Sequence, residues 1–446
     1  MPDFPSDFTW GVSTAAYQIE GAAAAGGKGE SIWDRFVRLP GRVVDGSTGD
    51  VATDHVRRYR QDVASMAELG VSAYRFSVSW PRVLPSGRGR PAPAGLDFYD
   101  RLVDALLEHD IAPWVCLYHW DLPQALQDAG GWTGRDVVHA FADYAEIVAE
   151  RLGDRVSTFL MLNEPNVHAL LGHLTGEHAP GTSDMGAFFS AVHHQNLATG
   201  EAIRRLRASS PAWRLGTVLN LQPIVAADEG EEHEAAVALA DAAFHRASLD
   251  PLLLGSYPDV VVPFLAPLLR DGDLATIHQE IDVLGVNHYT RLRVRADAAS
   301  PAGLALVPPP EGAEVTAMGW EVAPEAFRAQ LIELKERYGN PPVVVTENGA
   351  AYADAAPVGG RVEDPRRVRY LMRYLRALAS ALEAGCDVRG YFVWTLVDNF
   401  EWAYGFSRRF GLVHLDLDTL ARTPKRSFEA YREVIRANAV PAAGSS

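Results

Sequence analysis

The sequence predicts an α/β protein, a single (β/α)8 TIM barrel, and three observations lead to this fold class. Short apolar runs alternate with longer amphipathic stretches along the whole chain of 446 residues. The apolar runs are almost continuously hydrophobic, which is typical of parallel strands buried on both faces. There are eight of them, and eight parallel strands with right-handed helical crossovers close into a barrel.

The predicted strands are spread over the chain, and each is followed by a stretch long enough for a helix. In chain order they are residues 8–16, 72–80, 112–120, 157–165, 214–222, 283–290, 342–349 and 388–396. No Ser- or Gly-rich linker divides the chain. We therefore predict one domain over residues 1–446, with a frayed tail from about residue 439.

Four helical segments carry clear signals. Residues 53–70 and 94–110 have apolar side chains at every third or fourth position. Residues 363–385 start at Asp364–Pro365, a capping residue followed by proline in the first helical position. The pair Thr423–Pro424 repeats this signal and predicts that the last helix starts there.

An open, doubly wound sheet is the alternative arrangement of the same elements. It would require a phosphate-binding glycine loop, and the nearest candidate is GAAAAGGKGES at residues 21–31. That stretch does not have the P-loop spacing, because Ala22 stands where glycine is required and Gly29 where serine or threonine is required. Residues 296–323 are poorly periodic and rich in Pro and Ala, and we expect a long loop there, which usually has a function.

Composition and charge exclude several classes of function. The formal net charge of −16 disfavours nucleic acids and anionic membrane surfaces as partners. No apolar run approaches the roughly 18 residues of a membrane span. The N-terminus shows no secretory signal, and Cys116 and Cys386 provide no disulfide framework, so we expect a cytoplasmic protein. The sequence leaves homo-oligomer formation open.

Polar and aromatic side chains stand where the predicted strands end. The active site of such a barrel lies at the C-terminal ends of its strands, so these side chains are expected to meet at one rim. They are Gln18, Arg75, Trp80, His119, Trp120, Asn163, Glu164, Asn220, Asn287, Tyr289, Glu347, Asn348, Trp394, Glu401 and Trp402. For Trp80 and Asn220, a structural role at a strand end explains the residue equally well.

Glu164 and Glu347 end the fourth and seventh predicted strands, which face each other across an eight-stranded ring. Cleavage of a glycosidic bond requires two carboxyl groups across a pocket of sugar size, since one protonates the leaving oxygen and the other attacks or activates water. The amides, imidazole and further carboxylate of the rim can bind hydroxyl groups, and its tryptophans can stack on a sugar ring. The rim thus predicts glycosidic chemistry.

Seven motifs, in the same order, resemble those of glycoside hydrolase family 1, the β-glucosidases and their relatives. They are FTWGVSTAAYQIEGA, YRFSVSWPRVLP, YHWDLPQAL, NEP, GVNHYT, TENGA and DNFEWAYGFSRRFGLVHLD, and the resemblance covers roughly residues 4 to 438. It implies a retaining, exo-acting β-glucosidase that forms a covalent glycosyl-enzyme intermediate. It also implies a small β-glucoside or short oligosaccharide as substrate, and neither a metal nor a cofactor.

The resemblance assigns a role to each site residue. Glu164 of NEP is expected to be the acid/base, and Glu347 of TENG the nucleophile. The expected substrate-binding residues are Gln18, His119, Trp120, Asn163, Tyr289, Trp320, Trp394, Glu401 and Trp402. Arg75 and Tyr289 should contact the nucleophile and lower its pKa, whereas a neutral, partly desolvated site should keep the acid protonated.

Two positions depart from the family pattern on the leaving-group side. Asn166 follows NEP directly, where the family usually has Trp, and His173 stands where an aromatic Tyr is common. We expect both side chains to lie at the leaving-group site. His168, His173 and His178 are five residues apart, a spacing that does not put metal ligands on one helix face, and no metal is expected there.

Two alternative functions are weighed against β-glucosidase activity. A 6-phospho-β-glycosidase of the same family would carry a small residue at position 401, because a carboxylate repels phosphate, and this chain has Glu401. A non-catalytic, sugar-binding barrel would have lost one of the paired carboxyl groups, and both Glu164 and Glu347 are present. The preference among glucosides, galactosides and fucosides is not predicted.

Overall fold

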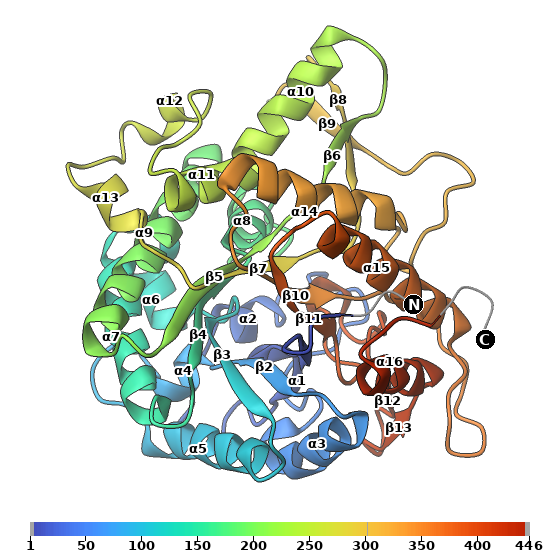
Figure 1. Cartoon of the computed structure of the whole chain (residues 1–446). Coiled ribbons are helices and arrows are strands. Elements are labelled where there is room, and N and C mark those ends of the chain that lie inside the picture. Colours follow the sequence, from blue (N-terminus) through green and yellow to red (C-terminus); the bar gives the residue numbers. More distant parts are fainter. Residues whose placement is uncertain (1–3, 301, 442–446) are drawn as a thin grey trace.

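A closed barrel of eight parallel strands forms the centre of the molecule (Figure 1). The computed structural model describes residues 4–300 and 302–441. Around the ring the strands follow the order β1-β11-β10-β7-β5-β4-β3-β2. Their bounds are Thr9–Ser13 (β1), Ala73–Ser77 (β2), Ala112–Tyr118 (β3), Thr158–Asn163 (β4), Arg214–Asn220 (β5), Val283–Asn287 (β7), Val343–Asn348 (β10) and Val388–Trp394 (β11). The fold class and all eight predicted strands are confirmed.

Helices surround the barrel and connect each strand to the next (Figure 1). The main helices are α3 (His55–Leu69), α5 (Pro93–Leu107), α7 (Asp136–Leu152), α9 (Met185–Ser209), α11 (Ala247–Leu253), α14 (Pro324–Tyr338), α15 (Pro365–Glu383) and α16 (Arg426–Ala437). Shorter helical elements are α1 (Ala16–Ile19), α2 (Ile32–Phe36), α4 (Trp80–Val83), α6 (Gln124–Asp128), η1 (Gly131–Thr133), α8 (Pro165–Ala169), η2 (Leu170–Leu174), α10 (Glu231–Asp241), η3 (Ala242–Arg246), α12 (Val262–Leu265), α13 (Asp273–Ile277) and η4 (Trp402–Tyr404). The strands outside the barrel are β6 (Ile224–Ala226), β8 (Leu292–Ala296), β9 (Leu304–Val307), β12 (Val413–Leu415) and β13 (Arg422–Pro424).

Apolar side chains fill the inside of the barrel, which is therefore a packed core and not a pore. They are Ala73, Trp114, Cys116, Leu160, Val218, Val283, Val344 and Phe392. Strand β1 contributes Gly11, where a Cβ atom would lie 2.3 Å from the ring of Phe392 in the neighbouring β11. The ring of Phe392 thus requires a residue without a side chain on β1.

The structure corrects the predicted start of the last helix. The signal at Asp364–Pro365 is confirmed, since Pro365 is the first residue of α15. The same signal at Thr423–Pro424 is misleading, because these residues belong to β13, which pairs with β12, and α16 begins at Arg426. Proline is tolerated at the edge of a small sheet, where its missing amide hydrogen is not needed.

Residues 296–323 are not entirely a loop, as the sequence suggested. Leu304–Val307 forms β9, which pairs with β8, and these two strands and β6 make a three-stranded sheet. Figure 1 shows this sheet and α10 projecting together from the ring of helices. Such short strands have too few residues for a clear period of two.

The two ends of the described chain are joined. The amide of Phe4 donates to the backbone oxygen of Asn438 at 3.0 Å, and Nδ2 of Asn438 donates to the backbone oxygen of Phe4 at 2.8 Å. Of the tail predicted to fray, Ala439 and Val440 are buried, and residues 442–446 lie outside the described residues. No helix in the described part of the chain combines the length and the apolar character of a membrane span.

Candidate active site

Glu164 reaches the barrel mouth because the chain turns sharply where β4 ends. Its backbone is left-handed, with φ of 47°, and Pro165 begins α8 directly after it. Proline has no amide hydrogen for a strand ladder, but it suits the first turn of a helix. The carboxyl group is buried, and its Oε1 accepts hydrogen bonds from Nδ2 of Asn220 and of Asn287, both at 2.8 Å.

Glu347 lies in β10, and a cation and a phenol hold its carboxylate. NH1 of Arg75 donates to Oε1 at 2.6 Å, and the hydroxyl group of Tyr289 donates to Oε2 at 2.6 Å. Both contacts that the sequence suggested for Glu347 are present. Because each oxygen has its own donor, the direction of the carboxylate is fixed.

A row of polar side chains connects the two carboxyl groups. Nδ2 of Asn287 donates both to Glu164 and, at 3.1 Å, to Oδ1 of Asn163. The same Oδ1 accepts from NH2 of Arg75 at 2.6 Å, and Nδ2 of Asn163 donates to Nε2 of His119 at 3.0 Å. On the shorter path around the ring, β5 and β7 lie between β4 and β10. Strands distant in sequence are therefore bonded to one another at the site.

The two carboxyl groups differ in their electrostatic surroundings. Burial, assisted by the charge of Glu347, raises the pKa of Glu164 to about 8. Burial also raises the pKa of Glu347, while Arg75 and Tyr289 act in the opposite direction. Both contacts act to lower the pKa of Glu347, as the sequence suggested, but desolvation outweighs them. The contact with Arg75 nevertheless favours the ionised form of Glu347, whereas Glu164 keeps its proton at neutral pH.

A second polar group surrounds Glu401, on the loop after β11. Nε2 of Gln18 donates to the backbone oxygen of Phe400 at 2.9 Å and lies 3.3 Å from Oε2 of Glu401. Burial and the charge of Glu347 raise the pKa of Glu401 to about 8. Oε1 of Gln18 and Nδ1 of His119 are buried, and neither has a hydrogen-bond partner among the described residues. This group therefore has polar atoms that are free to bind a ligand.

Three tryptophans pack beside this group. The ring of Trp402 lies 4.7 Å from that of Trp120, and the rings of Trp402 and Trp394 lie 5.8 and 5.9 Å from the imidazole of His119. Nε1 of Trp120 donates to the backbone oxygen of Asn163 at 2.9 Å. The aromatic rings are thus fixed to the same strand ends as the carboxyl groups.

A cavity of about 270 Å³ lies against these groups, although Gln18, Arg75, Asn163 and Asn287 are not among the residues that line it. One part of its wall is polar and aromatic and consists of His119, Trp120, Glu164, Asn220, Tyr289, Glu347, Trp394, Glu401 and Trp402. The other part consists of Val167, Leu170, Leu171, Glu177, His178, Gln222, Phe244, Leu292, Leu306, Met318, Trp320, Tyr404 and Phe410. Because most of this second set is apolar, the cavity combines a polar region with an apolar wall.

The structure distinguishes the roles of the two residues that the sequence left open. Asn220 belongs to the site, since it donates to Glu164. Trp80 is fully buried, and its Nε1 donates to the backbone oxygen of Gly87, so it has a structural role. Asn348 is also structural, with its amide bonded to the backbone oxygen of His288.

Asn166 and His173 do not line the cavity, contrary to our expectation. Nδ2 of Asn166 donates to the backbone oxygen of Asn220 at 2.8 Å, and its Oδ1 accepts from the amide of Asn220 at 3.3 Å. Asn166 therefore positions Asn220, which in turn holds Glu164. His173 is buried beside His168. Leu170 and Leu171 line the cavity instead.

Of the histidines after β4, His168 and His173 are packing residues, whereas His178 lines the cavity. His168 is bonded to the hydroxyl group of Tyr118 and to the amide of Gln195. Burial lowers the pKa of His173 to about 4 and that of His178 to about 3, so both are neutral. In the described part of the chain, no group of three or more His, Cys, Asp or Glu side chains could hold a metal ion.

Known proteins share this fold and this length. Residues 1–440 match the sequence profile of the family described as Glycosyl hydrolase family 1. Beta-glucosidase A of Acetivibrio thermocellus is 44% identical over 441 residues, which cover 98% of this chain and 98% of that protein. The structure of a family 1 β-glucosidase from Thermotoga maritima is 43% identical, with a TM-score of 0.95 over 99% of this chain and 100% of that chain. A β-glucosidase from Thermotoga maritima in complex with glucoimidazole gives 43% identity and a TM-score of 0.94, over 98% and 100%.

Proposed function

The chain belongs to glycosyl hydrolase family 1, and on that premise we propose that it is a retaining, exo-acting β-glucosidase, which hydrolyses terminal non-reducing β-D-glucosyl residues. The observation that carries the proposal is that two buried carboxyl groups on one cavity have different hydrogen-bond donors. Glu347 has a cation and a phenol as donors, and Glu164 has two amides. In this proposal Glu347 attacks the sugar as a carboxylate, and Glu164 donates a proton.

In the first step, a carboxylate oxygen of Glu347 bonds to the anomeric carbon. The bond from that carbon to the leaving oxygen breaks, and Glu164 transfers its proton to this oxygen. The leaving group departs as a neutral alcohol, and the glucosyl group remains bonded to Glu347 as an ester. A pKa of about 8 keeps the proton on Glu164 available at neutral pH.

In the second step, the same two residues release the sugar. The ester removes the negative charge of Glu347, which is one of the causes that raise the pKa of Glu164. Glu164 then takes a proton from water, the water oxygen bonds to the anomeric carbon, and Glu347 leaves as a carboxylate. Two inversions give net retention of configuration, which is the mechanism of this family.

The remaining polar residues are proposed to hold the sugar. Asn163 would bind the 2-hydroxyl, and Gln18, His119, Glu401 and Trp402 would bind the 3-, 4- and 6-hydroxyls. A hydroxyl group beside Gln18 and His119 would provide partners for the buried Oε1 and Nδ1 atoms that have none among the described residues. Trp394 and Trp120 would support the sugar ring, and Trp320, whose ring lies 5.3 Å from that of Tyr289, would border the leaving group.

We propose short β-linked oligosaccharides such as cellobiose, and glucosides with aryl leaving groups, as substrates. The apolar wall that includes Leu306 and Met318 supports the second class. A cytoplasmic location is proposed because the cysteines Cys116 and Cys386 are both free and buried, as is usual in a reducing compartment.

A 6-phospho-β-glycosidase is the disfavoured alternative. Glu401 is buried on the cavity wall, where burial and the charge of Glu347 disfavour any negative charge, and a phosphate would add one there. The test is a panel of nitrophenyl β-glycosides with and without a 6-phosphate. Hydrolysis of the glucoside, with none of the 6-phosphoglucoside, is the expected result. Hydrolysis of the phosphorylated substrate alone would reverse the assignment, and hydrolysis of neither would favour a binding protein.

A further inference from the structure

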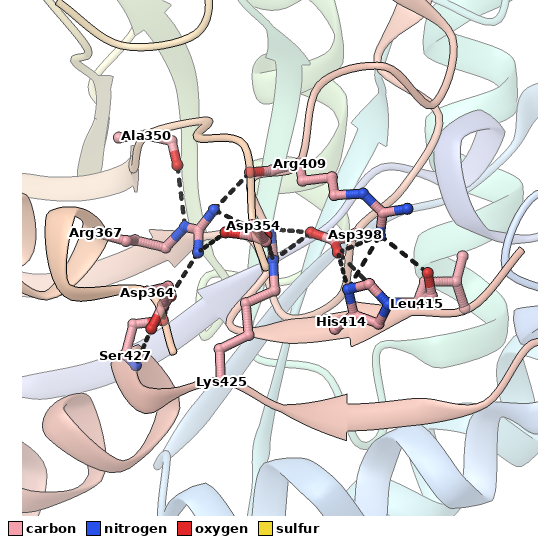
Figure 2. A network of polar contacts seen from close by, with 11 residues as sticks. Ala350, Asp354, Asp364, Arg367, Asp398, Arg409, His414, Leu415, Lys425 and Ser427 are labelled. Atoms are coloured by element: carbon pink, nitrogen blue, oxygen red, sulfur yellow. Dashed lines mark hydrogen bonds and ion pairs between the residues drawn. The ribbon is translucent and has the colours of Figure 1, made fainter. Parts of the chain in front are cut away.

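A buried cluster of charged side chains joins the two loops that carry the chain away from β10 and β11 (Figure 2). We call it the Lys425 network; it consists of Asp354, Asp364, Arg367, Asp398 and Lys425. Asp354 belongs to the loop of residues 349–364 after β10, and Asp398 to the loop of residues 395–412 after β11. None of its members lines the cavity, and the catalytic steps above do not use them.

Lys425 stands before α16 and is fully buried between two carboxylates. Its Nζ lies 2.5 Å from Oδ2 of Asp354 and 2.7 Å from Oδ1 of Asp398. Burial lowers the pKa of Lys425. Burial also acts to raise the pKa of Asp398, but the cations Lys425, Arg367 and Arg409 outweigh this effect and hold that pKa below its usual value. Asp398 is therefore ionised at neutral pH, and the two carboxylates favour the charged form of Lys425.

Asp398 closes the base of its own loop. Besides Lys425, its Oδ1 accepts from the amide of Gly411 at 2.9 Å, and its Oδ2 accepts from NH1 of Arg409 at 3.1 Å. The two sides of the loop approach so closely here that a Cβ atom on Gly411 would lie 2.2 Å from the amide nitrogen of Asp398. Lys425 thus fixes the point from which the loop leaves the barrel.

Glu401 follows Asp398 by three residues in the same loop. Between them, the amide of Phe400 donates to the backbone oxygen of Gln18 at 3.2 Å, and Nε2 of Gln18 donates to Oδ1 of Asn399 at 3.2 Å. This short stretch is therefore held by Gln18 near Glu401 and by the Lys425 network at Asp398.

The loop after β10 is hydrogen-bonded to the same network. The backbone oxygen of Ala350, three residues after Glu347, accepts from Nε of Arg367 at 3.1 Å. NH1 of Arg367 donates to Asp354 at 3.0 Å, and NH2 donates to the backbone oxygen of Arg409 at 2.7 Å. Arg367 therefore bonds directly to both loops, as Figure 2 shows.

The charge of the network requires an explanation other than stability. Replacing buried ion pairs by apolar side chains of similar volume is often neutral or stabilising. Charge-assisted hydrogen bonds, by contrast, are directional and fix the geometry of the groups they join. In this network Lys425 and Arg367 join two loops. One loop contains Ala350, three residues after Glu347, and the other contains Asp398, three residues before Glu401.

We propose that the Lys425 network positions Glu401 relative to Glu347, so that the sugar hydroxyls are bound when the anomeric carbon faces the nucleophile. This inference rests on the proposed function, in which Glu401 binds hydroxyl groups of glucose. Lys425, Asp398 and Arg367 are then positioning residues, which act through the loops without touching the substrate. Xylose lacks the hydroxymethyl group of glucose, so displacement of Glu401 affects xylosides less than glucosides.

The test compares nitrophenyl β-glucoside with nitrophenyl β-xyloside in the double variant Lys425→Met/Asp398→Asn. The two substitutions remove one charge of each sign, so the net charge of the network is unchanged. We expect kcat/KM for the glucoside to fall by roughly 10-fold, the effect of one poorly made hydrogen bond. The xyloside should lose only a small part of this factor.

The matched control is Arg135→Met/Asp273→Asn. These residues form another ion pair with a buried carboxylate, between the start of α7 and α13, away from both loops. Its loss should lower the unfolding temperature and leave the ratio of glucoside to xyloside activity as in the unmodified enzyme. A merely structural effect of the Lys425 network would give this same pattern.

An unchanged glucoside-to-xyloside ratio in the folded double variant would overturn the proposal. Asp398→Asn alone, in which Lys425 keeps Asp354, is the second variant and should change the ratio in the same direction. Failure of both variants to fold would also count against the proposal, since the network would then serve the fold as a whole. If the unmodified enzyme hydrolysed no β-glucoside, the proposed function would fail instead, independently of these variants.

Discussion

Buried carboxyl groups have opposite pKa shifts in two regions of this molecule. On the cavity wall, burial raises the pKa of Glu164 and of Glu401 to about 8. In the Lys425 network, Asp398 is equally buried, yet its pKa lies below the usual value. The difference is the presence of cations, because Asp398 contacts Lys425 and Arg409 directly, whereas Glu164 is bonded by the amides of two asparagines.

One fold thus contains both carboxyl groups held as anions and carboxyl groups that retain a proton. A buried carboxylate with a cation in contact stays ionised and joins segments of chain, and one without a cation retains a proton that it can transfer. Glu347 combines the two cases. It has Arg75 as a cation partner, but it also lies on the wall of the cavity.

Glu347→Ala tests this combined case and should have the largest effect. Without the carboxylate no glycosyl ester can form, and we expect hydrolysis of β-glucosides to fall by a factor on the order of 10⁶, as for other enzymatic nucleophiles. With α-glucosyl fluoride, the variant should instead synthesise β-linked products, because the fluoride occupies the space of the missing carboxylate. Steady-state turnover well above background would show that another group attacks the sugar.

Glu164→Gln tests the proton that burial keeps on the second carboxyl group. General acid catalysis contributes about 10²- to 10⁴-fold, and good leaving groups need less of it. Cellobiose and alkyl glucosides should therefore lose more rate than dinitrophenyl glucoside in the first step. In the unmodified enzyme, kcat/KM should decline as the pH rises through about 8, and this decline should be absent in the variant. Equal losses for all leaving groups would contradict an acid role.

The same comparison predicts opposite effects on stability. The folded-state pKa of Glu164 is raised, so its contribution to stability is complete below the unfolded value and is lost as the pH rises towards 8. Glu164→Gln should accordingly stabilise the protein by about 1 kcal/mol at pH 5 and about 3 kcal/mol at pH 7, because glutamine does not titrate.

The folded-state pKa of Asp398 is lowered, and its contribution is present above the unfolded value and is lost in acid. Asp398→Asn should therefore destabilise the protein, by about 3–5 kcal/mol at neutral pH, and by less as the pH falls below 4. Unfolding free energies in denaturant at several pH values measure both effects. If both variants changed the free energy of unfolding in the same direction, the proposed difference between the two regions would be wrong.

The sequence predicted the barrel and its reactive rim because both depend on local patterns. A buried parallel strand is a continuous apolar run, and a polar residue at its end lies on the rim wherever the strand falls in the ring. Glu164, Glu347 and the two partners of Glu347, Arg75 and Tyr289, were therefore found from short motifs. Asn287 was placed on the rim, but its bridge between Glu164 and Asn163 was not predicted.

The remaining features depend on contacts between distant segments. Asn166 was misplaced because its side chain bonds to the backbone of Asn220, which no local pattern indicates. The helix signal at Thr423–Pro424 was overridden by pairing with β12. The Lys425 network was not predicted, since its charges are spread between positions 354 and 425 in no motif. Leu306 gave no signal either, since β9 is a short strand of an outer sheet.

Leu306→Asn tests the apolar part of the cavity wall and should have the smallest effect. Leu306 is 65% exposed, so an aryl leaving group against it would bury apolar surface that is otherwise in water. Partial burial of one aliphatic side chain stabilises by about 1 kcal/mol, and we expect kcat/KM for aryl and alkyl glucosides to fall roughly 5-fold. Cellobiose, whose leaving group is a polar sugar, should be affected less.

Hydrolysis of the glycosyl ester should keep its rate in this variant, because the leaving group has departed before that step begins. Leu417→Asn is the matched control, since Leu417 is also an exposed leucine, at 46%, but does not line the cavity. The measurement is steady-state kinetics on substrates that share the glucosyl group and differ in the leaving group. If Leu306→Asn changed all of them alike, or slowed hydrolysis of the ester, the boundary between the sugar site and the apolar wall would lie closer to the carboxyl groups than the cavity lining indicates.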